Sequence, residues 1–165
     1  MTNPGDEDMR SAASDFDFLL GQWHVSHRRL KDRLAGSHDW EIFDGTSTVQ
    51  AILGGAGNID DNVLRLPSGT YRAVSLRTFE PATKLWSIWW LDGRYPTRID
   101  TPVIGGFADG VGTFMADDVL AGTRIRVRFR WTRTDTAAPH WEQAFSDDEG
   151  ASWETNWTMD FRRST

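Results

Sequence analysis

The candidates for proton transfer in this sequence are His27 and Glu142. His24 and His27 have the spacing of a metal-binding helix, but the residues around them alternate between apolar and polar, as in a β-strand. Side chains three positions apart on a strand point to opposite faces, so the two imidazoles cannot bind one ion. His27 continues the apolar row of Trp23 and Val25 and is expected inside, either as a hydrogen-bonded packing residue or as a general acid–base group. We predict no metal site and no cofactor.

Arginines are the second chemically versatile group, because a guanidinium can bind a carboxylate through two parallel hydrogen bonds. The arginines at positions 124, 126, 128 and 130 alternate with Ile125, Val127, Phe129 and Trp131. This pattern is typical of a strand with one solvated face, although Arg128 could instead bind a ligand in an interior that accepts charge. Arg98 lies near a Tyr95-Pro96 turn and belongs either to a surface network of ion pairs or to a polar gate over a pocket.

Several reaction classes are excluded by missing motifs. The sequence has no cysteine, which excludes disulfides, thiolate nucleophiles and cysteine-based zinc sites. The glycine-rich stretches at 54–58 and 105–112 lack the Gly-Lys-Ser/Thr ending of a phosphate-binding loop, and no Gly-x-Ser-x-Gly motif is present.

The amino-acid composition and the charge limit the kinds of partner that the protein is expected to bind. The 165 residues include nine Trp, nine Phe and two Tyr, which indicates one ordered domain with a core of large, flat side chains. The net charge of −6 argues against nucleic acid as a partner. No stretch approaches the ~20 apolar residues of a membrane span. The first residues are acidic and resemble no signal peptide, so we expect a cytoplasmic protein that does not bind membranes.

The elements that must position these groups are mostly strands. Residues 1–13 are predicted to be a flexible tail, and Ser14 to Gly21 a short helix that begins with a capping box and ends at glycine. Residues 14–165 form one domain, in which about nine or ten short segments alternate with period two and are separated by turn residues. This pattern predicts an all-β fold, an antiparallel sandwich or barrel.

The last predicted hairpin allows a specific register. A symmetric turn between His140–Phe145 and Trp153–Thr158 pairs Phe145 with Trp153 and Trp141 with Trp157. Glu142 then lies opposite Asn156, on the other face of the hairpin.

The segment Phe18-Leu19-Leu20-Gly21-Gln22-Trp23 resembles the start of the calycins, the superfamily that includes lipocalins and fatty-acid-binding proteins. The resemblance implies an antiparallel up-and-down barrel in which Trp23 lies at the closed end beneath Arg162 or Arg163. The segments 16–23, 86–94, 102–105 and 141–146 are more specifically similar to a bacterial family of small calycin-like domains of unknown function. That resemblance implies a fold but no activity. Haem binding of the nitrobindin type is not implied, since His140 falls in the same row as Glu142.

The leading functional hypothesis is a protein that binds a small hydrophobic or aromatic ligand in an aromatic-lined barrel. The candidate binding residues are Trp23, His27, Trp89, Arg98, Arg128, Phe129, Trp131, Trp141, Gln143 and Trp157. The alternative is a cofactor-free isomerase or cyclase in the same cavity, with His27 or Glu142 as the acid–base group. A third hypothesis concerns the strand Leu85–Leu91, which is apolar on both faces and could form a homodimer interface.

Overall fold

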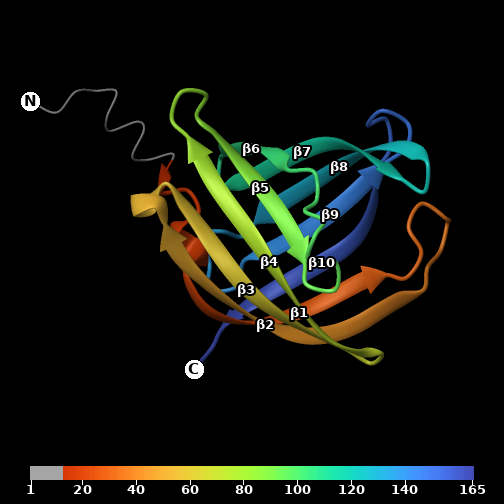
Figure 1. The fold of residues 1–165 in the computed structure, drawn as a ribbon, viewed down its shortest axis with the longest axis horizontal. Helices are drawn as coiled ribbons and strands as arrows, with labels where there is room; N and C mark the ends of the chain where they lie inside the picture. The colour runs from red at the N-terminus through yellow and green to blue at the C-terminus, as the bar shows by residue number, and fades with distance from the viewer. Residues whose placement is uncertain (1–12) are drawn as a thin grey trace, which may run out of the picture.

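A computed structural model describes residues 13–165 and shows ten antiparallel strands that close into one barrel (Figure 1). The strands are β1 (Gly21–Leu30), β2 (Trp40–Ile52), β3 (Gly57–Leu66), β4 (Gly69–Glu80), β5 (Leu85–Asp92), β6 (Val103–Ala108), β7 (Val111–Leu120), β8 (Thr123–Thr132), β9 (His140–Ser146) and β10 (Glu154–Arg163). Each strand pairs with its neighbours in sequence, and β1 pairs with β10 to close the barrel. The all-β, up-and-down prediction is confirmed.

The flexible tail expected at residues 1–13 lies outside the described residues, apart from Ala13. No helix among residues 13–165 has the length and apolar character needed to cross a membrane.

The strand β8 illustrates why the chain forms this sheet. Ile125, Val127 and Trp131 are buried, while Arg124 and Arg126 between them are exposed. Alternation of period two gives the strand one face for the interior and one for water. The expected solvated arginine row is therefore found.

The short helix predicted from Ser14 to Gly21 is not confirmed. The segment from Ser14 to Gly21 contains one 3₁₀ turn, η1 (Asp17–Leu19). Another 3₁₀ turn, η2 (Leu53–Gly55), follows β2. Residues three apart in a 3₁₀ turn lie on the same side. The turn thereby points both Phe16 and Leu19 into the end of the barrel, where each is 1% exposed. Backbone hydrogen bonds from Leu19 N to Phe16 O at 3.0 Å and from Leu20 N to Asp17 O at 3.2 Å hold the turn, together with the burial of these two side chains.

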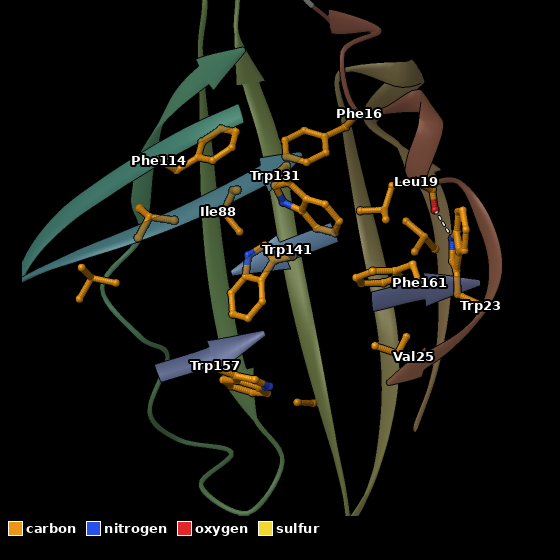
Figure 2. Packing of buried hydrophobic residues seen from close by; sticks show 14 of the residues in the cluster. Phe16, Leu19, Trp23, Val25, Ile88, Phe114, Trp131, Trp141, Trp157 and Phe161 are labelled. Atoms are coloured by element: carbon orange, nitrogen blue, oxygen red, sulfur yellow. Dashed lines mark hydrogen bonds between the residues drawn. The ribbon is translucent and has the colours of Figure 1, made fainter. Parts of the chain in front are cut away.

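Aromatic side chains fill the end of the barrel next to η1. The Phe16 ring lies 4.9 Å from that of Trp86 and 5.6 Å from that of Phe114. Trp23 donates a hydrogen bond from Nε1 to the carbonyl oxygen of Leu19 at 2.8 Å (Figure 2). This end is closed by packing.

The guanidinium of Arg163, near the end of β10, covers Trp23. Its central carbon lies 3.8 Å from the Trp23 ring centroid, and its nitrogens donate to the carbonyl oxygens of Leu20 and Phe18. Of the two arginines expected over Trp23, Arg163 occupies the position.

The predicted register of the β9–β10 hairpin is wrong. Phe145 pairs with Glu154, and a bulge at Asn156 shifts the register so that Trp157 pairs with Gln143. The cause is the connecting loop, in which Ser146 donates to Asp148 at 2.7 Å and Ser152 N donates to the same carboxylate oxygen at 2.8 Å. These bonds hold residues 147–153 in a loop wider than a symmetric hairpin turn, so the strand begins after Trp153.

Candidate functional site

A cavity of about 560 Å³ occupies the barrel interior. Its lining includes Arg33 from the β1–β2 connection and Arg98 and Asp100 from the β5–β6 connection, which places its mouth at the end opposite η1. The β1–β2, β3–β4, β5–β6, β7–β8 and β9–β10 connections lie at this end (Figure 1). The volume is within the range of small-molecule sites. The barrel therefore has one end closed by aromatic packing and one end that gives access to a cavity.

One wall of the cavity is aromatic and comes from β5, β8, β9 and β10. Trp131, Trp141 and Trp157 follow one another along the barrel interior (Figure 2). The Trp141 and Trp157 rings meet edge to face at 5.5 Å and 87°, and Trp90 meets Trp157 at 5.7 Å and 88°. Edge-to-face contacts of this kind stabilise the rings in fixed orientations. The wall is therefore a rigid aromatic surface.

The opposite wall is polar and comes from β1, β3 and β4. Asp60 and Arg77 form an ion pair at 2.8 Å although each is only about 5% exposed or less. The other Asp60 oxygen accepts hydrogen bonds from the backbone N–H of Ser75 at 2.6 Å and from Asn62 at 2.5 Å. Arg77 also donates to Asn58 at 2.8 Å. The inner part of this wall thus carries opposite charges that neutralise each other.

His27 joins the two walls. Its Nδ1 accepts a hydrogen bond from Nε1 of Trp157 at 3.1 Å, and its ring stacks on Phe43 at 4.5 Å. Since an indole N–H can only donate, Nδ1 is unprotonated and the neutral imidazole has its hydrogen on Nε2. Burial, and then the positive charge of Arg29, lower the pKa of His27 to about 3. At neutral pH, His27 is therefore an uncharged imidazole that carries its hydrogen on Nε2.

Four arginines line the mouth. Arg29 pairs with Glu41 at 2.8 Å and donates to the Tyr71 hydroxyl at 2.9 Å. Arg94 pairs with Asp92 through two nitrogens, the shorter bond being 2.8 Å.

Arg33 and Arg98 also line the mouth, and neither forms an ion pair with the described residues. Burial and the nearby Arg29 charge lower the pKa of Arg33. Asp100 lines the same mouth, and its pKa is raised by burial and by the charges of Asp118 and Asp92.

Most of the site residues expected from sequence line this cavity. They are His27, Arg98, Phe129, Trp131, Trp141, Gln143 and Trp157. Gln143 donates from Nε2 to Asn156 at 2.8 Å, which fixes its amide against the bulge of β10.

Four other expected residues lie elsewhere. Trp23 is buried in the closed end, with its ring against Phe161 at 5.8 Å. Arg128 lies on the outer face of β8, 4.4 Å above the Trp153 ring.

The remaining two residues, Glu142 and Trp89, lie on the outer face of the barrel, because successive side chains of a strand alternate between its two faces. Glu142 belongs to the outer row of β9, where it pairs with Arg130 and Thr158 across the sheet. On β5, Ile88 and Trp90 line the cavity, so Trp89 between them points outward. Trp90, rather than the expected Trp89, therefore lines the cavity.

Sequence reasoning missed the polar wall. On β3 the apolar residues Ile59 and Val63 face outward, whereas Asp60 and Asn62 line the cavity. The inward row also contains Leu64, which is fully buried, so both faces of β3 carry apolar residues and alternation does not decide between them. The signal in the sequence that could have revealed this wall is the presence of Asn58, Asp60 and Asn62 at every second position of one strand.

No group of three or more His, Asp or Glu side chains in residues 13–165 is placed to hold a metal ion. No protein-family model matches the chain, and no curated protein matches it.

Proposed function

We propose that the protein binds a small, flat, largely aromatic molecule inside its barrel. The observation that carries this proposal is the two-walled cavity of about 560 Å³. Aromatic faces on one side favour a conjugated ring system, and the polar groups opposite them favour hydrogen bonds at one edge of that ring system.

The state of His27 favours binding over acid–base catalysis. Its Nδ1 is occupied by Trp157, and a pKa of about 3 makes the imidazole a very weak base. Glu142, the other candidate for acid–base chemistry, is on the outer face of β9. A cofactor-free isomerase or cyclase would need another group, and Asp100 is the carboxyl at the mouth whose pKa is raised.

We infer in addition that the barrel belongs to the calycins and that the protein is bacterial and cytoplasmic. Support comes from the packing of Arg163 on Trp23 at the closed end, which matches the arrangement that the sequence resemblance implies.

A homodimer through the outer face of β5 is the partner that we propose. Trp89 and Leu91 on β5 are flanked on β4 by Leu76 and Val74, with which they pair across the sheet. Ile104 on the neighbouring strand β6 is 46% exposed. Contiguous apolar surface of this kind is typical of protein interfaces.

Calorimetric titration with 2-naphthamide, a neutral flat probe, tests the binding function. We expect binding in the native protein and a loss of affinity of about tenfold or more in Trp141→Leu, because an aromatic residue at the centre of a site contributes on the order of 2 kcal/mol. Trp153→Leu is the matched control, since Trp153 lies outside the barrel against Arg128. Absence of binding by the native protein to 2-naphthamide and to its carboxylate analogue would contradict the proposal, as would equal losses in the two variants.

A further inference from the structure

We infer that the ligand is an aromatic carboxylate, bound with its rings in the barrel and its carboxylate at the mouth between Arg33 and Arg98. The inference rests on the proposed function, that the cavity holds a flat aromatic molecule. It adds the charge of the ligand, the direction in which the ligand enters and two arginines that recognise it.

The first support is the charge of the lining. Five arginines and three aspartates line the cavity, an excess of two positive charges, in a protein whose net charge is −6. Glu41, outside the lining, balances one of them through Arg29. A cavity with excess positive charge in an acidic protein favours an anionic ligand.

The unbalanced charge is located at the mouth. Arg77, Arg29 and Arg94 each have a carboxylate partner at 2.8 Å. Arg33 and Arg98 have none among the described residues, and the acidic group that faces them, Asp100, does not come within ion-pair distance of either. Two guanidinium groups at the mouth therefore have donors available for an incoming ligand.

Arg33 is held in place without an ion pair. It belongs to the β1–β2 connection, which is attached to β10 by a hydrogen bond of 2.7 Å from the backbone N–H of Leu34 to Glu154. The central carbon of its guanidinium lies 5.6 Å from the Phe145 ring centroid, at the top of the aromatic wall. A guanidinium held in this way loses little freedom when it binds a carboxylate through two hydrogen bonds.

The inner cavity does not favour the reverse orientation. Arg77 is the arginine there, and its two terminal nitrogens already donate to Asn58 and Asp60. The Asp60 carboxylate would repel a ligand carboxylate. The rings must therefore lie inside, between His27 and the tryptophans, with the acid outside.

Titration with 2-naphthoate and 2-naphthamide separates charge recognition from ring binding, because the two probes differ in one group. We expect the native protein to bind the acid about tenfold more tightly than the amide, as for a charge-assisted hydrogen bond. Arg33→Gln and Arg98→Gln should each reduce this preference several-fold with little effect on the amide. Arg124→Gln is the matched control, since it removes an exposed arginine from the outer face of β8.

Each outcome decides a different point. Equal affinity of the native protein for acid and amide overturns this inference and leaves the proposed function standing. An equal loss of preference in Arg124→Gln overturns it as well, because the preference would then come from overall charge. Failure of both probes to bind overturns the proposed function and the inference with it. Thermal unfolding of each variant verifies that the barrel is folded.

Discussion

At the residue scale, the Asp60–Arg77 pair shows how the barrel tolerates charge in its interior. Both groups are nearly inaccessible to water, and hydrogen bonds from Asn62, Ser75 and Arg77 satisfy the Asp60 oxygens. A buried charge whose partner is removed is costly, whereas an exposed pair contributes little. Asp61, next in sequence, forms such an exposed pair with Arg72 at 2.6 Å.

These neighbouring aspartates allow a controlled comparison. We expect Asp60→Asn to lower the free energy of unfolding by about 3 kcal/mol, because it leaves the Arg77 charge buried without a counter-charge. Asp61→Asn should lower it by less than about 1 kcal/mol. Urea denaturation of both variants measures the difference, and similar losses would mean that the inner pair is hydrated.

At the element scale, β6 and β7 approach closely because of one glycine. Gly105 pairs with Phe114 on β7, and a Cβ atom at position 105 would lie 1.9 Å from the carbonyl oxygen of Thr113. At Gly106 the nearest backbone atom would be 4.0 Å away. The glycine pair therefore has one position where no side chain fits and one where alanine does.

We expect Gly105→Ala to destabilise the protein by about 1–3 kcal/mol, the usual range for an overpacked site. Gly106→Ala should be tolerated, because its methyl group meets nothing closer than ordinary contact distance. Thermal melting of the two variants tests this, and a larger loss in Gly106→Ala would contradict the strand geometry described for β6.

The alternation of apolar and polar residues along each strand also explains how much of the site could be predicted from the sequence. On β8 the apolar row Ile125, Val127 and Trp131 is buried, so the phase and the outward arginines follow from alternation alone. On β3 the rule gives no clear answer, since Ile59 and Val63 lie on the outer face while buried Leu64 lies in the same inward row as Asp60 and Asn62. The β9–β10 register depends on side-chain bonds within the loop, which alternation does not reveal. The contacts of Arg33 could not be predicted either, because the β1–β2 connection that carries it is held by a hydrogen bond from Leu34 to Glu154, a residue far away in sequence.

At the scale of the whole molecule, β3 to β5 have apolar residues on both sides of the barrel wall. Leu76 pairs with Ile59 on one side and Trp89 on the other, which gives an apolar row across three strands on the outer surface. Such a row is unfavourable in water and is covered in the homodimer that we propose.

We expect Trp89→Glu to convert the dimer into a monomer, because a charge would be buried in the interface. Thr158→Glu, which adds the same charge on the outer face of β10, should leave the dimer intact. Light scattering coupled to size-exclusion chromatography distinguishes these states. A native protein that is monomeric at high micromolar concentration would disprove the interface.

The pairing of β1 with β10 has a consequence for how the chain folds. Every other strand pair joins neighbours in sequence, but this one joins the two ends of the domain, from Trp23 opposite Arg163 to Arg29 opposite Trp157. Closure of so long a loop costs chain entropy before its contacts form, which slows folding. Until closure, the sheet has two free edges that can pair with another chain. Refolding should therefore compete with aggregation until β1 pairs with β10 and removes both edges.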